Sequence, residues 1–511
     1  MFGGRIAYSG TPVPRCVKGV SDVTIWHEDR LLIDGELVAA EGGKTYDTIS
    51  PYTEEVLGTA ADATMSDADR AIDAARTAFE TTDWSRDVAF RQHCLRQLHT
   101  ALVDNLENLR QILVHEVGAP LQITSGPQLE GPVEVVKWYG DLLDTYAFSE
   151  DLGIAEAFGG KHHRWVEKEA AGVTSLITAY NYPIQLALAK LAPALATGCT
   201  SILKGAPDTP WSILALGNLI AEHTDIPAGV VNVITSSDNE VSARLTTHPE
   251  VDAISFTGST PVGRAIMAAA SATVKRVFLE LGGKSAAVML DDGDPGMAAA
   301  FGAFATTSHS GQGCAITSRL VVPQDRLDEV VETAKAFMAG ITYGDPSDPT
   351  IQMGPLISAK QREKVEGYVE QAKADGARAV IGGKRPEQFD TGFFYEPTIL
   401  VDADENSTVA QEELFGPVLV VLPHDGSDDD AARVANNSIF GLSGAVLSAD
   451  HDRAVSFARR IRAGTVSVNG GIYYAPDAPF GGYKQSGIGR EMGAAAMEEF
   501  LERKTIAEPA Q

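Results

Sequence analysis

The residues from Gly172 to Leu281 alternate short apolar segments with longer segments of helical pattern. The apolar segments, each with the length and composition of a buried strand, are 172–179, 200–204, 230–234, 251–256 and 274–280. Pro183, Pro210 and Pro261 stand where a first helical turn accepts proline, because the N–H of that position needs no partner. Strands that alternate with helices predict parallel βαβ units, with helices on both faces of one sheet.

Other parts of the chain extend this architecture. A second α/β alternation starts near Ser285 and continues to about residue 470, so we expect an α/β fold with two doubly wound parallel sheets. A helical pattern covers 63–116, and the segment from Ser66 to Asp69 is expected to cap its first helix. A length of 511 residues allows about three structural units.

Residues 147–170 fit neither alternation. They are polar and indicate a hairpin around Gly159 and Gly160, and only a short tail follows Gly493. We expect both pieces to be surface loops or to form a sheet between subunits.

Acidic residues outnumber basic residues by 69 to 41, and the formal net charge is −28. Such a chain is repelled by phosphate backbones and anionic lipids, which argues against nucleic acid and membranes as partners. An anionic cofactor can still bind locally at a helix N-terminus. The apolar stretches 185–199 and 296–307 are too short or interrupted to span a bilayer, and residues 1–20 lack a signal-peptide core. We therefore expect a cytoplasmic protein.

The chain has four widely spaced cysteines, Cys16, Cys94, Cys199 and Cys314. Their spacing fits neither a disulfide framework nor a zinc site, so we expect reduced thiols, most of them inert in the core, and no metal. Cys314 differs because SGQGC (310–314) crowds it into a glycine-rich turn, where backbone N–H groups favour a reactive thiolate. The nearby His309 also fits a cysteine protease, but the surrounding chain is typical of a dinucleotide fold.

Two further segments contain candidate chemistry. FTGSTPVG (256–263) follows a strand and opens a helix, an arrangement that presents backbone N–H groups and hydroxyls to a phosphate. A glycine turn before a helix is also common without any ligand, and the G-x-G-x-x-G spacing is absent. In LELGG (279–283), Glu280 ends an apolar strand, where it either faces water or, with a raised pKa, acts as a general base.

Seven segments occur in a specific order along the chain. They are AYNYP (179–183), SILKG (201–205), FTGSTPVG (256–263), LELGGKS (279–285), GQGC (311–314), EELFGPV (412–418) and PFGGYKQSGIGRE (479–491). Together they resemble the successive motifs of the NAD(P)-dependent aldehyde dehydrogenase superfamily, over roughly residues 30–505.

The resemblance implies an enzyme that oxidises a small aldehyde to the carboxylic acid through a cysteine thiohemiacetal and thioester. It implies a dinucleotide-binding domain (1–146 and 171–282) and a catalytic domain (283–493). It also implies an oligomerisation element (147–170 and 494–511), in a homodimer or homotetramer.

The resemblance assigns roles to five catalytic positions. Cys314 would be the nucleophile, and the Asn181 side-chain amide, with the Cys314 backbone N–H, would stabilise the oxyanion. Glu280 would activate the water that hydrolyses the thioester. Lys190 and Glu491 would relay the proton away from Glu280.

The cofactor positions that the resemblance implies are Lys204, Gly258, Ser259, Gly263, Leu281, Glu413 and Phe415. Lys204 would contact the adenine-side ribose, Glu413 the nicotinamide ribose and Phe415 the nicotinamide. Pro207 stands where the family carries a ribose-binding glutamate that would repel a 2′-phosphate, so its loss weakens the argument against NADP. NAD is still favoured, and NADP stays an alternative. Tyr180 replaces the family's tryptophan before Asn181.

The matched substrate pocket is apolar and aromatic, with Tyr182, Leu186, Ile316, Tyr474 and Phe480. Because it has no arginine for a carboxylate, we expect an uncharged aliphatic or aromatic aldehyde. A semialdehyde-specific or CoA-acylating enzyme is the alternative, although Glu280 argues against transfer of the thioester to CoA. A non-catalytic binding protein of the same fold is a third hypothesis, against which the presence of Cys314, Glu280 and Asn181 argues.

Overall fold

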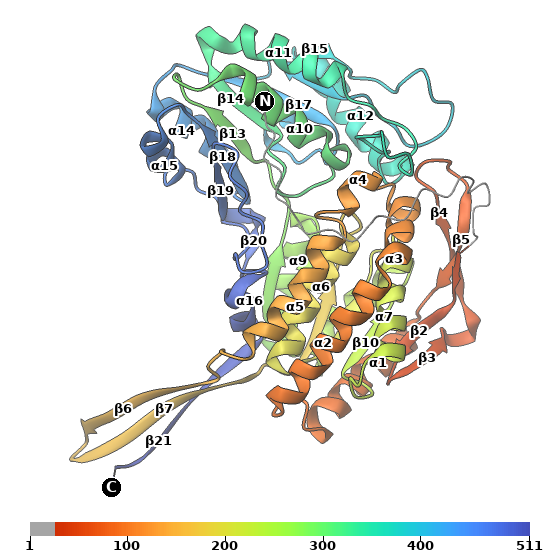
Figure 1. The fold of residues 1–511 in the computed structure, drawn as a ribbon, viewed down its shortest axis with the longest axis vertical. Helices are drawn as coiled ribbons and strands as arrows, with labels where there is room; N and C mark the ends of the chain where they lie inside the picture. Colours follow the sequence, from red (N-terminus) through yellow and green to blue (C-terminus); the bar gives the residue numbers. More distant parts are fainter. Residues whose placement is uncertain (1–25, 511) are drawn as a thin grey trace, which may run out of the picture.

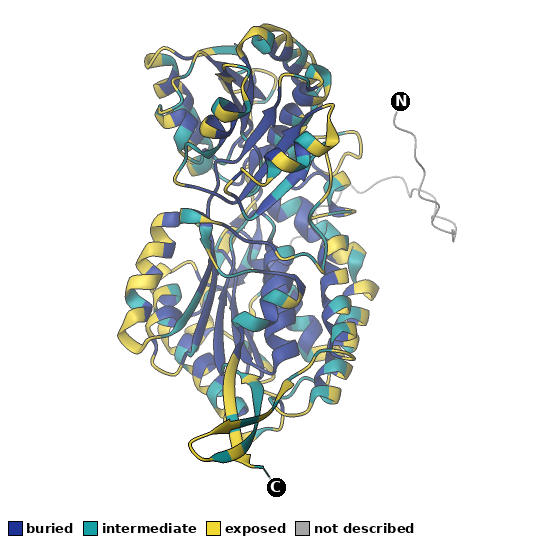
Figure 2. Ribbon diagram, turned by 90° about the vertical axis from the view of Figure 1, so that its left-hand side faces the viewer, coloured by how far each residue is buried: buried dark blue, intermediate teal, exposed yellow. Residues whose placement is uncertain are grey.

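The computed structural model describes residues 26–510, so Cys16 and the segment 1–20 lie outside the described residues. Two lobes, each built on a large sheet, lie one above the other, and a long arm extends from the lower lobe (Figure 1). The strands of both large sheets are mostly buried, whereas the arm is largely exposed (Figure 2). Within residues 26–510, no helix combines the length and apolarity needed to cross a membrane.

The sheet of the first lobe has eight strands, in the order β20 (Gly487–Ile488), β12 (Arg276–Glu280), β11 (Ala253–Thr257), β8 (Val173–Ile177), β9 (Thr200–Lys204), β10 (Val231–Ile234), β2 (Arg30–Ile33) and β3 (Glu36–Ala39). The central five, from β12 to β10, are parallel. The strands β20 and β2 join them in antiparallel orientation. The five strands predicted within 172–281 are therefore confirmed. The strand β20 comes from the range 283–493, whose other strands build the second lobe.

Helices cover both faces of this sheet. The helices of the lobe are α1 (Met65–Thr81), α2 (Val88–Asp104), α3 (Leu106–Ile112), α4 (Leu121–Thr124), α5 (Glu130–Leu142), α6 (Pro183–Thr197), α7 (Pro210–His223), α8 (Asn239–Thr247) and α9 (Thr260–Ala270). On one face, α6 and α7 pack with α2 and α5 behind them, and α1 packs with α8 and α9 on the other. The two faces are used because the chain runs from β8 toward β10 and then returns through β11 to β12, and crossovers between parallel strands are as a rule right-handed.

The first helix begins after Thr64 and not after Ser66. The Asp67 N–H donates to the Thr64 hydroxyl over 3.3 Å, and the Thr64 N–H donates to the Asp67 carboxylate over 2.9 Å. This reciprocal pair is a capping box. The predicted cap at Ser66 is wrong because Asp69, the acid at the matching position, pairs with Arg244 over 2.6 Å.

The sheet of the second lobe has seven strands, in the order β15 (Arg378–Ile381), β16 (Thr398–Val401), β17 (Val418–His424), β14 (Arg319–Pro323), β13 (Ala286–Met289), β18 (Ser443–Leu447) and β19 (Thr465–Val468). All are parallel except β15. The helices are α10 (Pro295–Thr307), α11 (Leu327–Ala339), α12 (Ala359–Ala374), α13 (Thr408–Gln411), α14 (Asp428–Asn436) and α15 (His451–Ala458). Separate apolar clusters lie on the two faces, one with α10 and α11 and the other with α12, α14 and α15. The predicted second doubly wound sheet is thus confirmed.

The arm is a three-stranded antiparallel sheet of β6 (Ser149–Ala157), β7 (Gly160–Ala170) and β21 (Leu501–Pro509). The hairpin predicted around Gly159 and Gly160 is present, and the C-terminal tail pairs along it after α16 (Gly493–Glu499). A smaller sheet joins β1 (Trp26–Glu28), β5 (Val56–Ala61) and β4 (Thr45–Ile49).

Gly263 lets α9 pack closely against the end of β12. A Cβ at this position would stand 2.7 Å from both Leu281 methyl carbons. We expect Gly263→Ala to destabilise the fold by about 1–3 kcal/mol through overpacking, measured by guanidinium denaturation. The control is Gly367→Ala in α12, where a Cβ meets nothing within 4 Å, and we expect it to stabilise by about 0.5–1 kcal/mol. Equal effects of the two substitutions would contradict the packing explanation.

Candidate active site

A cavity of about 190 Å³ lies at the carboxyl ends of β8, β11 and β12, where ligands bind in open parallel sheets. It is lined by Ala179, Tyr180, Asn181, Thr257, Gly258, Ser259, Glu280, Leu281, Gly282, Cys314, Gln361, Lys364, Glu413 and Phe415. These residues come from segments far apart in the chain and from both lobes. The structure thus brings most of the predicted catalytic and cofactor positions into one cavity.

Glu280 and Cys314 both line this cavity. Glu280 is the last residue of β12 and is only 3% exposed. Burial raises its pKa well above the usual range, and the Glu491 carboxylate adds to this effect, while Lys190 and the Cys314 thiol oppose it. Neither Glu280 oxygen has a hydrogen-bond partner among residues 26–510. A carboxyl group in this environment can exchange protons near neutral pH.

The acidic surroundings of Cys314 oppose ionisation of its thiol. Burial, together with the Glu280 and Glu413 carboxylates, raises its pKa well above the usual value. This effect acts against the thiolate that the glycine-rich turn is expected to favour. Glu280 lines the same cavity, and a general base beside the thiol is the other way to activate a nucleophile.

Asn181 is buried in the irregular segment between β8 and α6, beside the turn that carries Cys314. Its Nδ2 donates to the Gln312 carbonyl over 2.9 Å. Because a carboxamide nitrogen carries two hydrogens, a second donor remains on this group. Its own backbone carbonyl accepts a hydrogen bond from Gln128 Nε2 over 2.8 Å.

Lys190 and Glu491 form a buried ion pair near Glu280. Lys190 comes from α6 and is fully buried. Backbone hydrogen bonds in both directions, each 2.7 Å long, join Glu491 to Phe480. The structure therefore places together the two residues predicted to relay protons, next to the predicted base.

Two predicted cofactor residues lie outside the cavity lining. Lys204 ends β9, and burial lowers its pKa to about 8 although Asp208 and Asp62 oppose this change. Gly263 lies within α9 and acts on the cavity through Leu281, which it contacts closely.

Gly258 and Glu413 are held in the cavity for different reasons. A Cβ on Gly258 would lie 2.3 Å from the Phe256 ring, so this position accepts only glycine without rearrangement. The Gly283 N–H donates to the Glu413 carboxylate over 2.9 Å. Burial still raises the pKa of Glu413 to about 7.

The sequence analysis missed Gln361 and Lys364, which line the cavity from α12, as well as Thr257 and Gly282. Gln361 Nε2 also donates to the backbone carbonyls of Leu414 and Phe415, over 2.9 and 2.8 Å. This helix is polar and lies outside the seven motifs, so no local signal could have revealed its role.

Tyr180 forms part of the cavity wall. Its ring meets the Phe415 ring edge-to-face at 6.0 Å. Its hydroxyl is buried and has no hydrogen-bond partner in the described part of the chain. The wall next to Asn181 is therefore aromatic, as it would be with the family's tryptophan.

The five predicted substrate residues do not line this cavity. Tyr182 and Ile316 lie beside Gly313, at 3.8 and 2.8 Å from the position of a Cβ there. The Tyr474 and Phe480 rings meet edge-to-face at 5.8 Å. The fifth residue, Leu186, is buried in α6. Tyr182 and Ile316 thus flank the turn that carries Cys314, and ionisation of Cys314 would raise the pKa values of Tyr182 and Tyr474.

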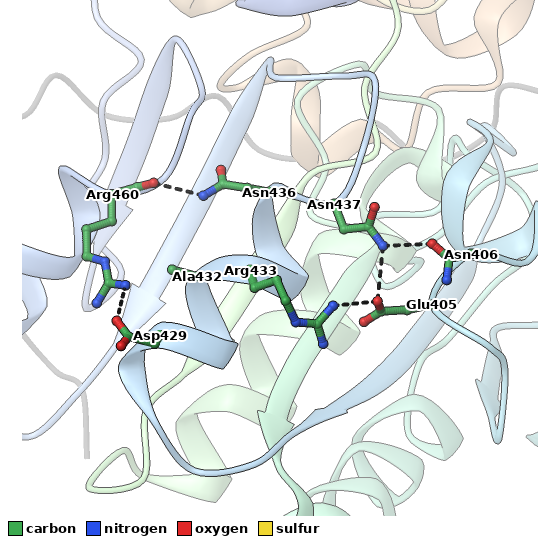
Figure 3. A pocket seen from close by; sticks show the side chains of 8 residues that line it. All are labelled: Glu405, Asn406, Asp429, Ala432, Arg433, Asn436, Asn437 and Arg460. Carbon is green, nitrogen blue, oxygen red and sulfur yellow. Dashed lines mark hydrogen bonds and ion pairs between the residues drawn. The ribbon is translucent and has the colours of Figure 1, made fainter.

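A wider depression lies in the second lobe (Figure 3). Its lining residues are Glu405, Asn406, Asp429, Ala432, Arg433, Asn436, Asn437 and Arg460. Arg433 pairs with Glu405 over 2.5 Å and Arg460 with Asp429 over 2.7 Å. Because its cations bind its own acids, and because it shares no residue with the Cys314 cavity, we assign it a structural role.

The fold and site together define an α/β oxidoreductase with a cysteine nucleophile. Residues 37–506 match the model of the aldehyde dehydrogenase family. A 3-succinoylsemialdehyde-pyridine dehydrogenase from a Pseudomonas species is 40% identical over 476 residues, which cover 93% of this chain and 97% of that protein. The chain therefore belongs to the aldehyde dehydrogenase family.

Solved structures agree with this assignment. Betaine aldehyde dehydrogenase from Staphylococcus aureus, solved with NAD+, is 36% identical with a TM-score of 0.90 and covers 94% of both chains. A variant aldehyde dehydrogenase from Pseudomonas syringae, solved with NAD+ and octanal, is 36% identical with a TM-score of 0.88. That match covers 94% of this chain and 96% of the other.

The buried ion pair makes a direct prediction for stability. We expect Lys190→Met to destabilise the fold by roughly 3–5 kcal/mol, because Glu491 would remain buried without its cation. Guanidinium denaturation measures the change. Lys137→Met is the matched control, since Lys137 pairs with Asp141 on the surface and we expect little change there. A Lys190→Met protein as stable as the wild type would contradict this interpretation.

Proposed function

We propose that the protein oxidises an uncharged aliphatic or aromatic aldehyde to the carboxylic acid with NAD+, and that Cys314 carries the substrate covalently. The position of the Cys314 thiol and the buried Glu280 carboxyl group in one cavity is the main support, because it pairs a nucleophile with a base. Asn181 in the same cavity offers a donor to the oxyanion.

The cavity fits a dinucleotide cofactor. Glu413 and the Gln361 Oε1 offer acceptors and Lys364 offers a donor to ribose hydroxyls, and the N-terminus of α9 with Ser259 suits a pyrophosphate. When bound, NAD+ supplies the hydride acceptor. The NAD+ complexes of the related structures support this choice. NADP+ stays an alternative because Pro207 replaces the glutamate that would repel a 2′-phosphate.

The chain's own residues perform the proton transfers in this proposal. Glu280 accepts the Cys314 proton as sulfur attacks the aldehyde carbon, and Asn181 Nδ2 with the Cys314 N–H stabilises the negative oxygen. Before hydrolysis, Glu280 releases this proton through the Lys190–Glu491 pair, a role that the position of the pair near Glu280 supports. After oxidation, Glu280 takes a proton from the water that attacks the thioester and returns it to the departing Cys314 sulfur.

Substitution of Glu280 tests the order of these steps. We expect Glu280→Gln to slow both the first formation of NADH and the steady-state turnover, the latter roughly 100-fold or more, because Glu280 is the base for thiol attack and for hydrolysis, and general-base catalysis contributes about 10²–10⁴-fold. Stopped-flow absorbance at the NADH band measures both phases. A rise in KM with unchanged kcat would contradict the base assignment. Cys314→Ala is the control, for which we expect neither burst nor turnover.

The same residue predicts the pH dependence. Glu280 acts as a base only when it is ionised, and its pKa is raised. Wild-type kcat should therefore fall as the pH decreases through that raised pKa, and Glu280→Gln should lose this dependence. If kcat of Glu280→Gln still fell at low pH as it does in the wild type, the titrating group would be another residue.

The substrate class follows from the residues around the Cys314 turn. The relatives are named for chemically different aldehydes, so their names do not decide the substrate of this chain. We expect kcat/KM for octanal and benzaldehyde to exceed that for succinic semialdehyde by roughly ten-fold or more, since a carboxylate would lose its hydration without a cation partner. Initial rates with NAD+ and NADP+, with and without CoA, measure this. A preference for succinic semialdehyde or a requirement for CoA would support the alternative instead.

We also propose that 1–146 with 171–282 bind the dinucleotide, that 283–493 form the catalytic domain, and that the arm (147–170 and 494–511) joins subunits of a cytoplasmic homodimer or homotetramer. Leu152, Ile154 and Phe158 of the arm are exposed, and their apolar side chains are suited to contact another subunit.

A further inference from the structure

Asn181 lies in a segment, residues 178–182, that belongs to no helix or strand. The regular backbone hydrogen bonds of a sheet or a helix therefore do not fix its backbone. A donor of an oxyanion hole must nevertheless be held within a fraction of an ångström, because misplacement costs much of the rate. Contacts from elsewhere in the chain must supply this restraint.

Gln128 supplies one such contact from between α4 and α5. Its Nε2 donates to the Asn181 backbone carbonyl over 2.8 Å, across 53 positions of sequence. Its own backbone N–H donates to the Ile123 carbonyl over 3.2 Å. The Gln128 side chain is fully buried, and its Oε1 has no hydrogen-bond partner among residues 26–510. Burying a long polar side chain costs entropy and hydration, which one neutral hydrogen bond offsets only in part.

The other contact comes from the turn that carries Cys314. Asn181 Nδ2 donates to the Gln312 carbonyl, and the Gln312 side chain is itself anchored. Its Oε1 accepts from the Ile357 N–H over 2.9 Å, and its Nε2 donates to the Pro355 carbonyl over 3.3 Å. Asn181 is thus held at its backbone by Gln128 and at its side chain by Gln312.

We propose that Gln128 is a positioning residue, which sets the Asn181 carboxamide for the oxyanion through its hydrogen bond to the Asn181 carbonyl. This inference rests on the proposed role of Asn181. Gln128 does not touch the cavity and acts only through Asn181. Loss of its donor should therefore slow the chemical steps while leaving the binding of NAD+ and aldehyde nearly unchanged.

The test is a double-mutant cycle on the full chain with octanal and NAD+. We expect Gln128→Met, which keeps the length and removes the donor, to lower kcat about ten-fold and to change both KM values less than two-fold. In the Asn181→Ala background, Gln128→Met should cause no further loss, because the group that it positions is gone. Gln128→Asn, which keeps the amide on a shorter side chain, should lie between wild type and Gln128→Met.

Gln122→Met is the matched control. Gln122 on α4 also donates from its Nε2 to a backbone carbonyl, that of Pro349, over 2.8 Å, but it makes no contact with Asn181. We expect its kcat to equal that of the wild type.

The outcomes separate the two proposals. If Gln128→Met lowered kcat by the same factor in the wild-type and Asn181→Ala backgrounds, or left kcat unchanged, the proposed role of Gln128 would be overturned. An unchanged kcat in Asn181→Ala alone would instead overturn the role of Asn181. If Gln128→Met fails to fold, Gln128→Asn carries the same cycle, and its kcat loss must vanish in the Asn181→Ala background for the inference to hold.

Discussion

The close backbone approach at Gly282 and Gly283 is the constraint on which the site depends. The chain passes here from β12 of the first sheet to β13 of the second. A Cβ on Gly283 would stand 2.5 Å from the Cys314 carbonyl oxygen, and one on Gly282 would stand 2.6 Å from a Glu413 carboxylate oxygen. Because neither position has a side chain, the turn that carries Cys314 and the segment that carries Glu413 both reach the end of β12, where Glu280 lies.

Burial at this junction sets the chemistry of its acids. Glu280 and Glu413 both have raised pKa values because they have lost water; Glu491 raises the pKa of Glu280 further, and Lys190 lowers it. Burial and the neighbouring carboxylates also raise the pKa of the Cys314 thiol. In the proposed mechanism the thiol is therefore activated by Glu280 as a general base.

Much of the fold and site was predictable from the sequence. Parallel strands bury both faces and therefore appear as apolar runs, which is why the strands of 172–281 could be placed. Cys314 stands beside a glycine and Glu280 at a strand end, so their local context marked them, whereas Asn181 was indicated only by the resemblance to the family's motif. Gln128, Gln361 and Lys364 have no such context, because their roles depend on helices and linkers that only folding brings to the cavity.

The sequence by itself determined two doubly wound sheets, a hairpin around Gly159 and Gly160, and a set of motifs typical of the aldehyde dehydrogenase family. It left open whether the C-terminal tail is a loop or part of a sheet. Periodicity and motif order are local properties, so they survive without tertiary information. Only the tertiary structure decided the raised pKa of the Cys314 thiol, the cap at Thr64 and the restraint of Asn181 by Gln128. Each of these depends on which groups lie within a few ångströms of one another in the fold. The number of residues between two positions in the sequence does not determine that distance.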